Sequence, residues 1–152
     1  MIYQTYKKIL LPTNGSDYAN KALKHAVWFA SASGSEIIAL NVINPSSLAA
    51  LPEEHIRIQT LELLKEEGNK ALQKIFDLLK SKTDENYPEK IKLTPVIKEG
   101  SPADTIVKTV EEEGIDLITI GTSGKQGVNR LLLGSLAEKV VMTAPCPVLV
   151  VH

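Results

Sequence analysis

Five short apolar runs along the chain are separated by longer segments in which apolar residues recur at helical spacing. Each run predicts a strand, because it is short and is bounded by turn residues or by an amphipathic segment. The runs cover residues 9–11, 36–43, 91–97, 116–120 and 147–151. The second run is apolar at almost every position, which is typical of a strand buried on both faces of a parallel sheet. Pro95 lies inside the third run and indicates an edge strand, where a missing N–H donor costs little.

Two long amphipathic segments predict the first two helices. The first begins at a cap formed by Ser16 or Asp17 and ends at Gly34, since glycine readily takes the left-handed conformation that closes a helix. Trp28 falls in this helix, where we expect it to be partly buried. The second helix follows the second strand and carries Gly68 in its middle, although glycine weakens a helix interior.

The remaining helices are shorter. Ser101 is placed as the cap of the third, with proline at the first helical position, and Gly114 ends it. The fourth covers residues 135–143. Its buried face is expected to consist of Leu136, Val140 and Val141. Residues 44–52 and 82–90 are polar or proline-containing and are predicted to be loops.

The alternation of strands and helices predicts an α/β fold. Parallel strands need crossover connections, and helices in those connections cover both faces of the sheet. The expected architecture is therefore a doubly wound, three-layer sandwich, and a length of 152 residues suits a single domain over 1–152.

Composition narrows the classes of protein. Hydrophobic residues make up 43% of the chain, which is enough for a sizeable core. The formal net charge of −1 provides no basic surface for nucleic acid or an anionic membrane. Cys146 is the only cysteine, so no intrachain disulfide can form, and no apolar run approaches the roughly 18 residues of a membrane span. We therefore expect a soluble, cytoplasmic protein.

A glycine-rich loop between the fourth strand and the fourth helix is the segment most suited to binding chemistry. Its glycines are Gly121, Gly124, Gly127 and Gly134. Such a loop lies at the carboxyl end of a parallel sheet, where ligands of open α/β sheets bind. Its backbone N–H groups and the following helix N-terminus favour phosphate, to which Lys125 and Arg130 add charge and Ser135 a hydroxyl.

The loop differs from the two familiar phosphate-binding motifs. The chain contains neither a P-loop nor a G-x-G-x-x-G motif after its first strand. From composition alone, a flexible turn without a ligand explains the glycines equally well.

The spacing G-x2-G-x9-G-S, at Gly121, Gly124, Gly134 and Ser135, resembles the nucleotide loop of the universal stress protein family, in its ATP-binding branch. The likeness runs along the whole chain. It includes residues 9–16, 99–103, 114–118 and 145–151, in that order and at matching spacing.

This resemblance implies a Rossmann-like sheet of the adenine-nucleotide alpha hydrolase type, with strand order 3-2-1-4-5 and ATP as ligand. The implied nucleotide-binding residues are Pro12, Thr13 and Asn14 on the nucleoside side, the backbone of Val42 at the adenine edge, Gly121, Gly124, Gly134 and Ser135 at the ribose and phosphates, and Thr122, Lys125 and Arg130 in the same loop. The resemblance also implies a homodimer that pairs the last strand, Val148 to Val151, across a two-fold axis.

Asn14 departs from the family pattern, which usually has Asp at this position. Asparagine retains hydrogen-bonding capacity and loses the negative charge. Since hard cations prefer carboxylates, the case for a Mg²⁺ ion accompanying ATP is weaker in this chain.

No residue is identified as catalytic. His25, His55 and His152 are far apart in sequence and in no ligand spacing, Cys146 lies between two prolines and is interpreted as a small packed side chain, and Ser135 is explained as a helix cap. The sequence therefore favours a stress-response or regulatory protein that binds ATP with little or no turnover. A slow ATPase or nucleotide-dependent enzyme, and a dimeric interaction module without nucleotide, remain as alternatives.

Overall fold

A computed structural model describes residues 5–82, 91–122 and 133–152. Its sheet contains β1 (Lys8–Pro12), β2 (Glu36–Ile43), β3 (Leu93–Glu99), β4 (Leu117–Gly121) and β5 (Val148–Val151). The strand order is β3-β2-β1-β4-β5, and every neighbouring pair is parallel. The α/β fold and the strand order are thus confirmed.

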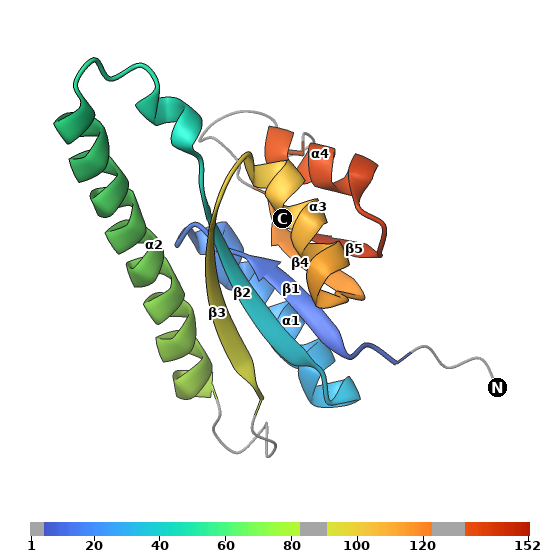
Figure 1. The fold of residues 1–152 in the computed structure, drawn as a ribbon. Helices are drawn as coiled ribbons and strands as arrows, with labels where there is room; N and C mark the ends of the chain where they lie inside the picture. The colour runs from blue at the N-terminus through green and yellow to red at the C-terminus, as the bar shows by residue number, and fades with distance from the viewer. Residues whose placement is uncertain (1–4, 83–90, 123–132) are drawn as a thin grey trace.

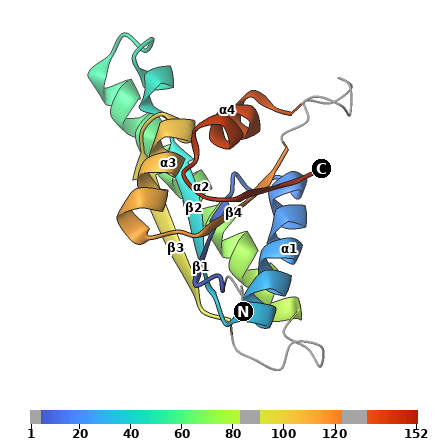
Figure 2. The same cartoon turned by 90° about the vertical axis from the view of Figure 1, so that its right-hand side faces the viewer.

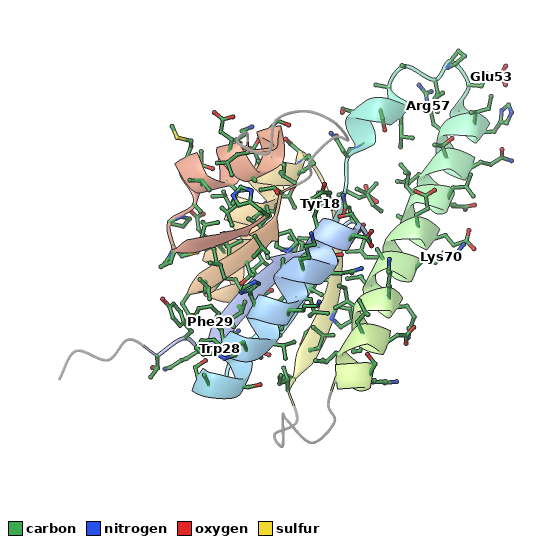
Figure 3. All side chains as sticks on the ribbon, turned by 180° about the vertical axis from the view of Figure 1, so that it is seen from behind. Tyr18, Trp28, Phe29, Glu53, Arg57 and Lys70 are labelled. Atoms are coloured by element: carbon green, nitrogen blue, oxygen red, sulfur yellow. The ribbon has the colours of Figure 1, made fainter. Side chains whose placement is uncertain are left out.

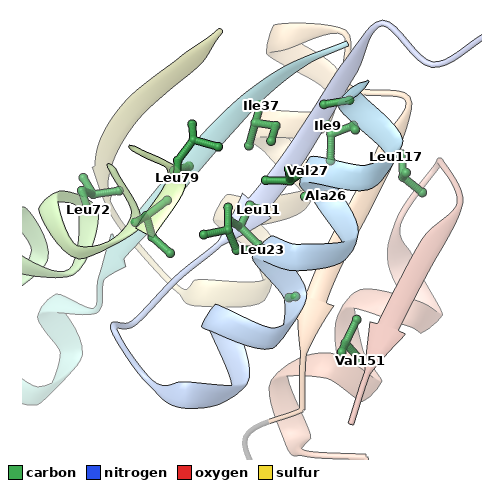
Figure 4. Close-up of a cluster of buried hydrophobic side chains, with 14 residues drawn as sticks. Ile9, Leu11, Leu23, Ala26, Val27, Ile37, Leu72, Leu79, Leu117 and Val151 are labelled. Atoms are coloured by element: carbon green, nitrogen blue, oxygen red, sulfur yellow. The ribbon is translucent and has the colours of Figure 1, made fainter. Parts of the chain in front are cut away.

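Helices cover both faces of this sheet, as Figures 1 and 2 show. They are α1 (Asp17–Ser33), α2 (Glu54–Lys82), α3 (Pro102–Glu113) and α4 (Ser135–Thr143). Side chains of α1 and α2 pack with alternate strand residues such as Ile9 and Leu11 (Figure 4). Side chains of α3 and α4 pack with the intervening residues, such as Leu10 and Ile118. This alternation follows from the two-residue period of a strand.

The helix ends agree with most of the predicted caps. Ser16 accepts the Ala19 N–H at 3.4 Å and caps α1. Gly34 and Gly114 close α1 and α3 with positive φ angles of 72° and 66°. Ser101 takes the cap position of α3, but within the described residues its side chain makes no capping bond.

Several details of the predicted elements are wrong. The expected loop over 44–52 contains a 3-10 helix, η1 (Pro45–Leu48), which Asn44 caps by accepting the Ser46 N–H. The third strand runs over 93–99 and not 91–97, although Pro95 does lie on an edge strand as predicted.

Two side chains are more exposed than predicted. On α4 the buried residues are Ala137 and Val140, whereas Val141 is 43% exposed. Trp28 is 58% exposed and packs edge-on against Phe29 (Figure 3). A short helix against one sheet buries a narrow stripe, and small residues such as Ala137 are the ones that let its backbone come close.

Candidate functional site

A cavity of about 240 Å³ lies at the carboxyl ends of β1, β2 and β4, against the first turns of α1, α3 and α4. Strand β1 has β2 on one side and β4 on the other, so the chain order reverses here. Such a switch point is the usual ligand site of an open α/β sheet. Five of the residues predicted from the sequence line the cavity together: Pro12, Thr13, Asn14, Val42 and Gly121.

The turn after β1 is held in shape by its own polar groups. Gly15 has a φ of 79°, which favours glycine at this position. Its N–H donates to the Thr13 hydroxyl at 3.2 Å, and the Ser16 N–H donates to the Asn14 side-chain oxygen at 3.0 Å. The side-chain oxygen of Asn14 therefore accepts a bond within the turn, and its NH₂ group, which makes no bond among the described residues, can donate to a ligand.

Gly121 is the last residue of β4 and lies against the first turn of α1. A Cβ atom at this position would run into the backbone carbonyl oxygen of Tyr18 and approach the Tyr18 Cβ to 3.0 Å. The close packing of α1 on β4 is thus sufficient reason for a glycine here. Thr122, next in the chain, is buried beside β5, where its N–H donates to the Val151 carbonyl at 2.9 Å. Its role in nucleotide binding stays a prediction.

The start of α4 forms another wall of the cavity, through Leu136 and Ala137. Gly134 occupies the cap position, with φ −59° and ψ 153°, and Ser135 is the first helical residue. The expected capping role of Ser135 is therefore wrong. Because glycine has no side chain to cap the helix, the first N–H groups of α4 can bind an anion. Gly124, Lys125 and Arg130 lie outside the described residues.

The buried Asn41, which the sequence did not indicate as a site residue, lines the cavity from β2. Its carboxamide donates to the Thr13 carbonyl at 2.9 Å. Asn41, Asn14 and Val42 also line a second cavity of about 270 Å³ on the α2 side of the sheet. A lone Asn in the apolar run of β2 was the available signal, because a buried polar group nearly always has a hydrogen-bond partner.

The groups considered for catalysis lie elsewhere. His25 is exposed on α1, and the exposed His55 pairs with Glu53 at 3.2 Å. Burial, and then the nearby Asp116 carboxylate, raise the pKa of the Cys146 thiol, which agrees with a packed and unreactive side chain. Among the described residues, no cluster of three or more metal-ligating side chains occurs. Within the same ranges, no helix is long and apolar enough to span a membrane.

Comparison with known proteins identifies relatives along nearly the whole chain. The model of the universal stress protein family matches residues 5–152. Universal stress protein MJ0531 of Methanocaldococcus jannaschii is 44% identical over 146 residues, which are 96% of this chain and 82% of the relative.

Solved structures resemble the chain in fold as well as in sequence. The universal stress protein UspA of Lactobacillus plantarum has a TM-score of 0.80 at 29% identity, covering 99% of this chain and 100% of its own. A universal stress protein in complex with cAMP has a TM-score of 0.66 at 25% identity, with 98% of each chain covered.

Proposed function

This chain belongs to the universal stress protein family, and we propose that it binds an adenine nucleotide, with ATP as the ligand, at the carboxyl ends of β1 and β4. The observation that carries this proposal is the convergence of Pro12, Thr13, Asn14, Val42 and Gly121 on one cavity. A relative in complex with cAMP supports an adenine nucleotide as the ligand class.

The walls of the cavity suggest an orientation for the nucleotide. Its apolar lining includes Leu40, Ile106 and Ile120, which suits a flat base. In this orientation the ribose lies near Asn14 and the phosphates near the start of α4, where N–H groups and the helix dipole favour negative charge. Gly124, Lys125 and Arg130 would complete the phosphate site.

We propose a regulatory role in the stress response, in the cytoplasm, with little or no turnover of ATP. Around the described part of the cavity, no side chain is placed as a general base or nucleophile. Incubation with ATP and Mg²⁺ is therefore expected to return the nucleotide intact. Phosphate release with multiple turnovers would instead favour the slow ATPase.

A homodimer is proposed to form through β5. This strand ends the sheet, so its outer edge can pair with a second copy. Val141 and Met142 on the adjacent α4 are 43% and 78% exposed and would add apolar area. Sedimentation equilibrium distinguishes the expected dimer from a monomer, which would contradict this part of the proposal.

Thermal unfolding tests the nucleotide site. A ligand that binds only the folded state at about 100 times its Kd stabilises that state by about 2.7 kcal/mol. For a chain of this size, this corresponds to a Tm increase of about 5 to 10 °C. We expect the increase with ATP, and an unchanged Tm in the presence of millimolar ATP, AMP or cAMP would contradict the proposal.

Asn14→Asp is expected to make ATP binding more dependent on Mg²⁺. A carboxylate can accept the Ser16 N–H with one oxygen and leave the other for a cation, whereas the single side-chain oxygen of Asn14 is already engaged. We expect Mg²⁺ to tighten ATP binding by roughly tenfold in the variant and by much less in the parent chain. The measurement is a pair of titrations with ATP, in Mg²⁺ and in EDTA, for both proteins.

The matched control is Asn44→Asp, because Asn44 makes the same kind of turn bond, to the Ser46 N–H at 3.1 Å, outside the first cavity. An equal Mg²⁺ response in the parent chain and in Asn14→Asp would count against the assigned role of residue 14.

A further inference from the structure

We propose that Asn41 is a positioning residue for base recognition. Its carboxamide donates a hydrogen bond to the Thr13 carbonyl oxygen. The backbone N–H of Val42 is then left free to donate to the edge of the base. The inference rests on the proposed nucleotide site and assigns to Asn41 a role that it exercises through the backbone of Val42.

The backbone groups of β2 point alternately toward its two neighbouring strands. Even-numbered residues of β2 direct their N–H and C=O groups toward β1, and odd-numbered residues direct theirs toward β3. The bonds that establish this are Glu36 N–H to Lys7 C=O and Thr13 N–H to Leu40 C=O on the β1 side, and Ile37 N–H to Lys92 C=O and Gly100 N–H to Ile43 C=O on the β3 side.

Val42 is the even-numbered residue that follows Leu40. In a regular parallel ladder its N–H would donate to the Thr13 carbonyl, directly after the bond from Thr13 N–H to Leu40. That carbonyl instead accepts the Asn41 carboxamide at 2.9 Å. In the described part of the chain no bond joins the Val42 N–H to Thr13. The donor and acceptor of the Val42 backbone therefore both point past the end of β1, at a cavity that Val42 lines.

Helix α2 leaves the space that the Asn41 side chain needs. A Cβ atom on Gly68 would lie 2.5 Å from Oδ1 of Asn41, a distance that real Cβ atoms do not reach. This contact explains a glycine inside a long helix, where it weakens helix formation.

The same face of α2 supports the turn itself. Lys74 Nζ donates to the Gly15 carbonyl at 3.2 Å, and the Ala71 methyl lies 3.3 Å from where a Cβ of Gly15 would be. Helix α2 thus holds both Asn41 and the turn after β1 in place.

A free donor and acceptor on one residue allow discrimination between purines. Adenine presents an acceptor at N1 beside the donor of its amino group, which complements a backbone N–H and C=O. Hypoxanthine presents a donor at N1 beside an acceptor, which leaves both backbone groups opposed to like groups. The arrangement therefore predicts that the protein prefers ATP to ITP, and that the preference depends on Asn41.

The test compares the Kd values of ATP and ITP for the parent chain and for Asn41→Leu, which has a similar volume and no amide. In the variant the Thr13 carbonyl becomes available to the Val42 N–H. We expect ATP affinity to fall about tenfold while ITP affinity changes by less than about twofold. Asn69→Ala, on the exposed side of α2, is the control and is expected to keep the ratio of the parent chain.

A double-mutant cycle checks that the effect passes through the carboxamide. Gly68→Ala should displace the Asn41 side chain and reduce the ATP-to-ITP preference in the parent chain. In an Asn41→Ala background the added methyl group has room, so Gly68→Ala should leave the preference unchanged. If Asn41→Leu does not fold, Gly68→Ala carries the test, because it retains the native residue at position 41.

The outcomes separate the two proposals. No binding of either nucleotide by the parent chain would overturn the proposed function. Binding of ATP with no preference over ITP, or an unchanged preference in both Asn41→Leu and Gly68→Ala, would overturn the role of Asn41 and leave the nucleotide site standing. A parallel fall in the affinities for ATP and ITP, with their ratio unchanged, would indicate a general structural effect of the substitution and would also overturn the role of Asn41.

Discussion

Gly134→Val is expected to lower ATP affinity by about 100-fold or more while the fold is retained. Gly134 has φ −59° and ψ 153°, which valine adopts without strain. The cost of placing valine at a helix cap is about 1 kcal/mol or less, because the glycine it replaces contributes no side-chain cap. Its isopropyl group, however, would cover the N–H groups of α4 that the proposal assigns to phosphate.

The measurement is the Kd for ATP together with the free energy of unfolding in urea. Thr143→Val provides the control, because Thr143 is an exposed residue at the C-terminal end of the same helix. Tight ATP binding by a folded Gly134→Val protein would show that the phosphates lie elsewhere.

Gly121→Ala is expected to destabilise the protein by about 3 kcal/mol, at the upper end of the range for overpacking. The new methyl group would collide with the Tyr18 carbonyl oxygen, and because that atom belongs to the backbone, α1 must shift to admit it. Such a loss is a large fraction of the roughly 5 to 15 kcal/mol that stabilises a typical domain.

Gly34→Ala is the comparison for this prediction. Gly34 also has a positive φ, of 72°, but a Cβ atom there would meet nothing within 4 Å. Only backbone strain remains, at a cost of about 1 kcal/mol. Urea unfolding could instead show that Gly121→Ala lowers the free energy of unfolding by less than Gly34→Ala does. The close packing of α1 on β4 would then not be what requires a glycine at position 121.

The two glycines therefore have different physical explanations, although they belong to one spacing pattern. Packing against Tyr18 accounts for Gly121 with no ligand present. Gly134 is in a conformation open to other residues, so its backbone does not require glycine, and its contact with phosphate is a proposal. A spacing motif alone does not distinguish a glycine required by packing from a glycine required by a ligand.

The order of strands and helices could be predicted because each element carries a local signal. Short apolar runs bounded by turn residues mark the strands, and Gly34 and Gly114 both close helices as expected. The position of Pro95 on an edge strand was also predictable, since proline lacks the N–H that a central strand needs.

Features that depend on contacts between distant segments could not be predicted. The role of Gly68 depends on Asn41, which is far from it in sequence and approaches it only in the folded chain. The choice between Ala137 and Val141 as the buried residue of α4 depends on how the helix is rotated against the sheet. The cap of that helix was assigned to Ser135, one residue late, because serine is the commoner capping residue.

In the candidate site, too, some residues could be predicted from the sequence and the direction of others could not. The family resemblance implied Pro12, Thr13, Asn14 and Val42 as nucleotide-binding residues, and these four do meet at one cavity. Thr122 was included because it belongs to the glycine-rich loop, yet its N–H is directed to Val151. Neighbours in a motif need not point the same way, and the sequence alone does not record their direction.

The most direct test of the central claim is a calorimetric titration of nucleotide-stripped protein with ATP and Mg²⁺. The account predicts saturable binding of about one nucleotide per chain, because the proposal places a single nucleotide in the cavity at the carboxyl ends of β1 and β4. An absence of binding at millimolar ATP would contradict it, and the alternative would then be a protein that acts through its surface contacts.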